Sequence, residues 1–182
     1  MKKTTIKLIL CVLLLCLNIG FIWGNSMLPA QLSEKVSDGA MSVYERVLMH
    51  PLFEKISVKL INLANRMLGT TIPNQDVGMY LLRKMAHFTE FLLLGLDLCW
   101  LFLILEQKGI HKLAMPLLFG TLTACIDETI QLYSPGRSSS LVDVWIDIAG
   151  LTVGIVILLF GHYVLTMLKR RKGKKPLEEN EL

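Results

Sequence analysis

The sequence lacks the residue patterns that usually mark metal, disulfide or nucleophilic sites. Its four cysteines, Cys11, Cys16, Cys99 and Cys125, all fall inside apolar blocks, and no pair has the spacing of zinc ligands. Disulfides are not expected within hydrocarbon, so we interpret the cysteines as small packing residues. No recognised nucleophile motif is present, and nothing indicates nucleic-acid binding, because the densest basic run follows the last apolar block. We therefore expect no cofactor, no metal ion and no nucleic-acid partner.

What the sequence has instead is apolar length. Of its 182 residues 53% are hydrophobic, and the mean hydropathy is +0.52. The apolar residues form four blocks, at residues 6–22, 82–105, 113–132 and 141–168, and a membrane-spanning helix needs about 20 such residues. The expected fold class is all-α, an integral membrane helical bundle of four transmembrane helices that forms one domain over residues 1–168. Residues 169–182 form a basic and then acidic tail.

The first block could also belong to a cleaved signal peptide, because basic residues precede both kinds of segment. Its apolar run is long, however, and no clear small-x-small cleavage site follows it. We therefore interpret this block as a retained membrane anchor.

Residues 23–81 connect the first two blocks and contain an amphipathic pattern. Apolar residues recur there at steps of three and four, at Phe53, Ile56, Leu60, Leu63 and Met67. This predicts an extracytoplasmic amphipathic helix and loop between the first and second spans. The helix could lie along the membrane surface or pack on the ends of the bundle, and the sequence favours neither.

Basic residues predict the orientation, since short cytoplasmic loops carry an excess of lysine and arginine. With four spans, the N-terminal lysines, residues 106–112 and the tail share one side of the membrane, whereas the short loop after the third span holds only Arg137. We therefore predict a multi-pass protein of the cell membrane with both termini in the cytoplasm.

Ionisable residues recur inside the last three spans, where each costs about 2.5 to 3.5 kcal/mol unless it is paired or hydrated. Most follow helical spacing, which places them on one face of each helix. The polar residues are Arg83, Lys84, His87, Glu90 and Asp97 in the second span, Asp127, Glu128 and Gln131 in the third, and Asp143 and Asp147 in the fourth. Gly150 and Gly154 extend the last stripe and predict a small-residue groove for a neighbouring helix.

Depth is the second reason to group these residues. At 1.5 Å per residue, Glu90 lies about 12 Å, Asp147 about 9 Å and Asp127 about 7 to 8 Å inside the outer boundary. If the three stripes face one another, they form a polar pocket that opens to the outside. Asp97 lies deeper and has no obvious partner in the sequence.

Acidic residues outnumber basic ones in this pocket, which leaves several states open. Clustered carboxylates can be protonated, hydrated or neutralised by a cation or cationic ligand. His87 with Glu90 or Asp127 could perform acid–base catalysis. A histidine with acids could also ligate a divalent metal, but a lone histidine without a local ligand cluster argues against it. The groups could instead be structural, with His87 paired to an acid and Asp127 and Glu128 paired to Arg137.

Three stretches resemble the VanZ-like family of bacterial membrane proteins. Residues 82–95, LRKMAHFTEFLLLG, resemble a Lys-x-x-His-Phe-x-Glu pattern, and residues 127–150 resemble Asp-Glu-x-x-Gln, Pro-Gly-Arg and Asp-Val elements. A weaker stretch is FIWGNSMLPAQLS at residues 21–33. The matching residues are Lys84, His87, Phe88, Glu90, Asp127, Glu128, Gln131, Pro135, Gly136, Arg137, Asp143 and Val144. Asp147 departs from the pattern, because many members have Asn there.

The resemblance implies a role in the cell envelope, since the founding member is associated with low-level teicoplanin resistance in Gram-positive bacteria. We expect the pocket to bind a membrane lipid, a lipid-linked cell-wall precursor or a lipophilic glycopeptide, and so to contribute to antibiotic resistance. Arg83, Lys84 and Arg137 would meet phosphate oxygens, and the acidic residues would position these bases or bind an amine.

Three alternatives remain open from the sequence. The protein could be a membrane-embedded enzyme on a lipid-linked substrate, with His87, Glu90 and Asp127 as catalytic residues. It could be a proton-coupled lipid transporter, for which four spans are few, so that a homo-oligomer would be needed. In the third alternative the polar residues only hold the bundle together.

Overall fold

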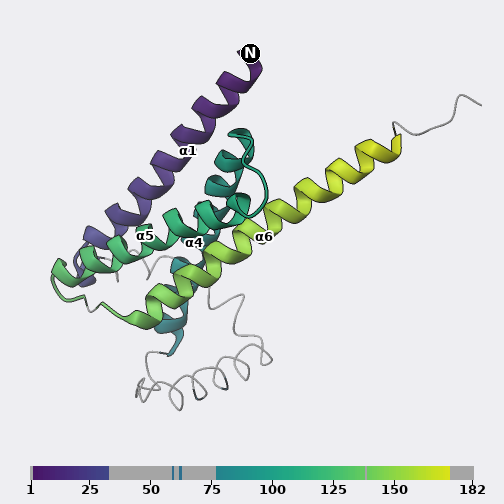
Figure 1. Cartoon of the computed structure of the whole chain (residues 1–182). Coiled ribbons are helices and arrows are strands. Elements are labelled where there is room, and N and C mark those ends of the chain that lie inside the picture. Colours follow the sequence, from purple (N-terminus) through teal and green to yellow (C-terminus); the bar gives the residue numbers. More distant parts are fainter. Residues whose placement is uncertain (1, 33–58, 60–61, 63–76, 138, 173–182) are drawn as a thin grey trace, which may run out of the picture.

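The computed structural model describes residues 2–32, 59, 62, 77–137 and 139–172 (Figure 1). Its long helices are α1 (Lys2–Met27), α4 (Val77–Ile104), α5 (His111–Tyr133) and α6 (Leu141–Lys172), and these ranges contain no strand. Each helix has an apolar stretch long enough to cross a membrane. The all-α class with four spans is therefore confirmed. The amphipathic helix expected around residues 53–67 lies outside the described residues, except for Asn62 and Lys59.

The helix bounds differ from the predicted spans mainly at the end of α1. The predicted span stops at Ile22, but the helix continues to Met27 through the segment Trp-Gly-Asn-Ser. The extension places Asn25 and Ser26 on the helix, where both contact side chains of other helices. The polar end of α1 is therefore part of the bundle and not the start of a loop.

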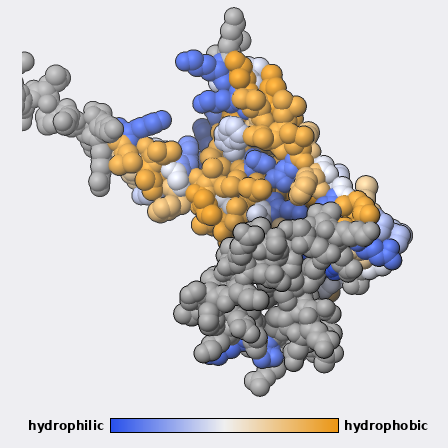
Figure 2. All heavy atoms as spheres, turned by 180° about the vertical axis from the view of Figure 1, so that it is seen from behind, coloured by the Kyte–Doolittle hydropathy of each residue, from blue (hydrophilic) through white to orange (hydrophobic). Residues whose placement is uncertain are grey.

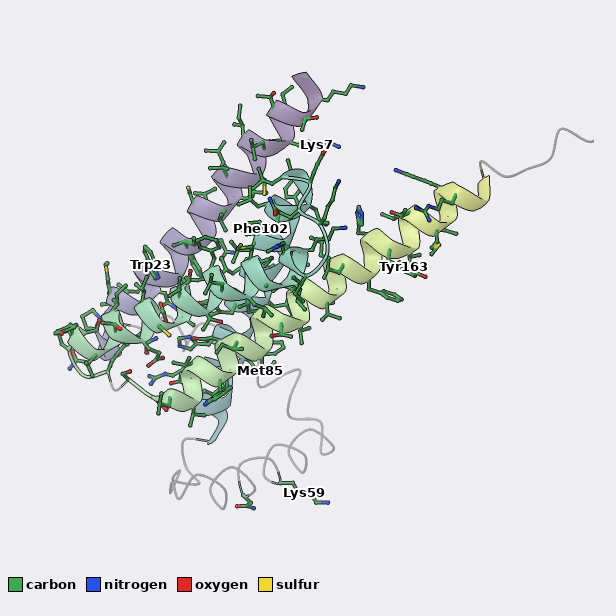
Figure 3. All side chains as sticks on the ribbon, in the orientation of Figure 1. Lys7, Trp23, Lys59, Met85, Phe102 and Tyr163 are labelled. Carbon is green, nitrogen blue, oxygen red and sulfur yellow. The ribbon has the colours of Figure 1, made fainter. Side chains whose placement is uncertain are left out.

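Successive helices run in opposite directions, so the end of α1, the start of α4, the end of α5 and the start of α6 lie together. Contacts between side chains show this directly, since Ser26 meets Asp127 and Lys84 meets Asp143. In Figure 3, Lys7 and Phe102 lie in the upper half of the bundle, whereas Met85 lies near the start of α6. The predicted polar stripes are consequently gathered at one end of the helices.

α4 and α6 form the most extensive helix–helix contact of the bundle, and glycines make it possible. A Cβ atom at Gly150 would collide with the main-chain carbonyl oxygen of Phe88, and one at Gly154 with that of Leu92. The two backbones therefore approach more closely than any larger residue would permit. The predicted small-residue groove on the fourth span is confirmed, and its partner is α4.

The bundle is hydrophobic outside and partly polar inside. Its buried apolar core consists of Ile22, Phe91, Leu94, Leu98, Cys99, Ala124, Leu151 and Ile155. Large apolar side chains such as Leu17 and Trp145 point away from the bundle and are 71% and 70% exposed. Figure 2 shows hydrophobic residues over much of the visible helix surface. Asp127 and Asp147 are at the same time fully buried. This distribution identifies a multi-pass membrane protein, because apolar surface of this extent requires a hydrocarbon solvent.

Among the described residues, the second half of α6 packs on the bundle only near its beginning, where Leu158 and Leu159 are partly buried against the core. No residue after Ile155 on this helix is buried, and Figure 1 shows the helix extending away from the other three. Tyr163 points outward there in Figure 3. This part of α6 does not contribute to the polar end of the bundle.

Candidate functional site: a buried polar cluster

Polar side chains from all four helices meet at the end of the bundle where α4 and α6 begin. We call this set the polar cluster; it comprises Asn25, Ser26, Lys84, His87, Glu90, Asp127, Glu128, Gln131, Asp143 and Asp147. Seven of these residues are buried: Ser26, Glu90, Asp127, Glu128, Gln131, Asp143 and Asp147. Buried polar groups at this density are costly in a membrane and indicate a functional site.

The centre of the polar cluster is formed by one residue from each of the last three helices. His87 of α4, Asp127 of α5 and Asp147 of α6 each offer an atom within 4.8 Å of the others. The His87 Nδ1 atom lies 3.5 Å from Asp147 Oδ1. The stripes predicted on the three spans therefore do face one another, as helical spacing implied.

α1 supplies hydrogen-bond donors to two of the acids. Ser26 Oγ donates to Asp127 Oδ1 at 2.6 Å, and Gln131 Nε2 donates to Asp127 Oδ2 at 2.9 Å. Asn25 Nδ2 donates to Glu90 Oε1 at 3.1 Å. Sequence reasoning assigned no role to Asn25 and Ser26. The only signal for them was the weak resemblance of residues 21–33, since polar residues just after an apolar block usually belong to a loop.

At the edge of the polar cluster, the acids bind partners other than Arg137. Lys84 forms an ion pair with Asp143. Glu128 Oε2 accepts a hydrogen bond of 2.8 Å from the main-chain N–H of Ser140, and Asp127 binds Ser26 and Gln131 instead of a guanidinium. The alternative in which Asp127 and Glu128 pair with Arg137 is not what the structure shows, because neither acid forms a hydrogen bond or ion pair with Arg137.

Arg137 lies in the loop between α5 and α6, beside the polar cluster. The main-chain N–H of Ala30 donates to the Pro135 carbonyl at 3.1 Å, and Gly136 adopts a positive φ of 74°, a conformation that favours glycine. The loop is thus tied to the segment after α1. The Arg137 guanidinium is partly buried and makes no hydrogen bond or ion pair with another residue in the described ranges.

Both positive and negative groups influence the pKa of Arg137. Burial lowers the pKa of Arg137, and the nearby positive charge of Arg83 lowers this pKa further. Asp127, Glu90 and Glu128 act in the opposite direction. An arginine nevertheless stays cationic at neutral pH, so Arg137 brings a positive charge to the edge of the cluster.

Asp97 does not belong to the polar cluster, although it lies on the same face of α4. Asn18 Nδ2 of α1 donates to Asp97 Oδ2 at 3.0 Å. The sequence offered no partner for this carboxylate because the donor lies on the first span, 79 residues away. The Asn18–Asp97 pair instead joins α1 to α4 nearer the opposite end of the bundle.

Four membrane-spanning helices with a buried polar cluster at one end define a polytopic helical membrane protein with an intramembrane polar site. A family model described as VanZ/LLP1 matches residues 9–165. The chain therefore belongs to the VanZ/LLP1 family, in agreement with the resemblance noted in its sequence. No curated protein and no solved structure matches the chain.

Proposed function

We propose that the polar cluster and its neighbouring guanidinium groups bind the phosphate of a lipid at the outer face of the cell membrane. The observation that carries this proposal is the position of Arg137, a partly buried cation in the loop beside the polar cluster that has no ion pair with a described residue. The positive charges of Arg137 and Arg83 repel each other, and a phosphate bound by Arg137 relieves that repulsion while accepting bidentate hydrogen bonds from its guanidinium.

The acids of the cluster support this role indirectly. Asp143 is engaged by Lys84, and Glu128 by the main chain of Ser140. Neither acid forms an ion pair with Arg137. Because the site lies at the ends of membrane helices, a ligand that diffuses within the bilayer can reach it. A membrane lipid or a lipid-linked cell-wall precursor has both the required anchor and the phosphate.

Family membership supports a role in the cell envelope. A protein that binds a lipid-linked wall precursor, or a lipophilic glycopeptide itself, would alter susceptibility to teicoplanin-type antibiotics in a Gram-positive bacterium. This placement requires the short loop with Arg137 to face outward, with both termini in the cytoplasm.

The proposal is tested by measuring how tightly the purified protein binds a polyprenyl phosphate. The matching uncharged polyprenol, which lacks only the phosphate, is the comparison ligand. We expect the phosphate to bind more tightly than the alcohol. Arg137→Gln should remove most of that difference, about 10- to 100-fold in affinity, because a hydrogen bond to a charged group contributes about 1.5 to 3 kcal/mol. Arg137→Lys should recover part of it.

Arg170→Gln is the matched control, since it removes an exposed arginine near the far end of α6. Equal affinity for the phosphate and the alcohol in the wild-type protein would overturn the proposal. In cells, the variants are compared at equal abundance. The effect of the protein on teicoplanin susceptibility should be largest for the wild type, smaller for Arg137→Lys and smallest for Arg137→Gln.

A second function is supported by the contact between His87 and Asp147. An imidazole beside buried carboxylates can transfer a proton to or from a bound lipid-linked substrate, and Glu90 and Asp127 border the same centre. This enzyme hypothesis requires turnover of the lipid by the wild-type protein and its loss in His87→Gln, while binding of the polyprenyl phosphate is retained. Binding without any turnover would reject it.

A further inference from the structure

Three side chains with metal-ligand chemistry converge at the centre of the polar cluster. His87, Asp127 and Asp147 come from three different helices, and their nearest donor atoms all lie within 4.8 Å of one another. No two of them are neighbours in the sequence. The sequence therefore contains no local ligand cluster and did not predict a metal site. The tertiary structure assembles the set that the sequence alone did not reveal.

Asp147 receives no hydrogen bond from the described part of the chain. Its side chain is completely buried, and neither carboxylate oxygen has a described donor. His87 Nδ1 lies 3.5 Å from Oδ1 but forms no hydrogen bond with it. A carboxylate that is removed from water without donors is strongly unfavourable unless it takes up a proton or a cation compensates it.

Other donors of the polar cluster bind other acids. Lys84 forms an ion pair with Asp143, and Asn25 donates to Glu90. Asp127 is oriented by Ser26 and Gln131, each of which donates to one of its oxygens. Each carboxylate oxygen has two lone pairs, so Asp127 can still bind an ion. Donors that fix a ligating carboxylate in this way are typical of metal sites.

We propose that His87, Asp127 and Asp147 bind a divalent transition-metal ion, for which Zn²⁺ is the best match. One imidazole nitrogen with carboxylate oxygens is a mixed set that zinc accepts, whereas Ca²⁺ and Mg²⁺ prefer oxygen alone. Two carboxylates and a neutral imidazole with a dication form an electrically neutral unit, which a membrane interior tolerates best. Three protein ligands leave a position for water or a ligand oxygen.

An ion would draw the three groups closer together. Tetrahedral zinc with bonds of about 2.0 to 2.2 Å places ligand atoms roughly 3.3 to 3.6 Å apart, and the three groups lie within 4.8 Å of one another without an ion. Side-chain rotation at His87 and Asp147 can shorten these distances, because neither is held by a hydrogen bond from another described side chain.

Zinc binding to the purified full-length protein tests this inference. The protein, carrying an affinity tag without histidines, is stripped with EDTA, loaded with ZnCl₂, desalted and measured by elemental mass spectrometry. We expect about one zinc ion per chain. His87→Gln and Asp147→Asn should each abolish it, and Ser26→Ala should lower the affinity about 10-fold, because it removes only an orienting donor.

Matched controls remove the same chemical groups elsewhere. His162→Gln changes an exposed histidine on α6, and Asp97→Asn changes an intramembrane carboxylate that binds Asn18; both should retain the zinc. Arg137→Gln should also retain it, so loss of phosphate binding and loss of metal binding are separable. Zinc that stays bound in both His87→Gln and Asp147→Asn would overturn the inference, as would a wild-type protein that retains none.

If either variant fails to fold, the wild-type protein alone decides the matter. Cobalt(II) loaded in place of zinc absorbs visible light in a manner that depends on its ligands. A spectrum of protein-bound cobalt with nitrogen and oxygen ligands supports the site. A spectrum that matches hydrated cobalt overturns it.

Discussion

Ser26 at the end of α1 donates a hydrogen bond of 2.6 Å to Asp127 of α5, across a sequence separation of 101 residues. Both side chains are buried. The first helix is thus not merely an anchor that holds the rest of the chain in the membrane. It supplies the donors that satisfy Asp127 and Glu90, so the polar cluster requires all four helices.

Removing this donor should weaken the bundle. Ser26→Ala leaves Asp127 Oδ1 without its hydrogen bond, and we expect the free energy of unfolding to fall by about 1.5 to 3 kcal/mol. Unfolding in a mixed-micelle titration with SDS measures the change. Thr166→Ala is the control, because the Thr166 hydroxyl is exposed and bonds only to its own helix; an equal loss in both variants would show that the contact with Asp127 is unimportant.

The close packing of α4 on α6 gives a prediction with an internal control. Gly154→Ala places a methyl group against the Leu92 carbonyl, and we expect it to destabilise the bundle by about 1 to 3 kcal/mol through overpacking. Gly161→Ala on the same helix meets nothing within 4 Å, so it should be neutral or stabilise by about 0.5 to 1 kcal/mol. Thermal unfolding of the purified variants tests both, and the reverse order would contradict the observed packing.

Lys84 and Asp143 join the starts of α4 and α6, and their coupling is measurable. Their side chains are 17% and 8% exposed, so the pair is only weakly screened by water. In a double-mutant cycle with Lys84→Gln and Asp143→Asn, we expect a coupling energy of about 0.5 to 3 kcal/mol. Additive effects of the two substitutions would show that the ion pair does not form in the membrane.

The predicted orientation is tested by labelling single cysteines. In a chain whose four native cysteines are replaced, Ser139→Cys in the loop with Arg137 should react with a membrane-impermeant maleimide added to intact cells. Lys108→Cys in the link between α4 and α5 should react only after permeabilisation. The opposite pattern would place the polar cluster near the cytoplasmic face and remove the basis for an envelope ligand.

The sequence determined the membrane-spanning elements and the faces on which their polar residues lie. Both depend on local properties: the length of an apolar run decides whether a helix can cross the bilayer, and helical spacing decides which side chains share a face. The step of four from Gly150 to Gly154 likewise indicated a close helix contact. These features do not depend on where the other helices are.

The partners of the charged residues were decided only by the tertiary structure. The sequence could not show that α1 continues past Ile22, because the polar residues of the extension, Asn25 and Ser26, bind acids on distant helices. It also could not choose Asp147 over Glu90 as the acid nearest to His87, since both lie on stripes that face the same centre. That choice depends on the rotation and crossing of packed helices, and close contact between the glycines of α6 and the backbone of α4 fixes both.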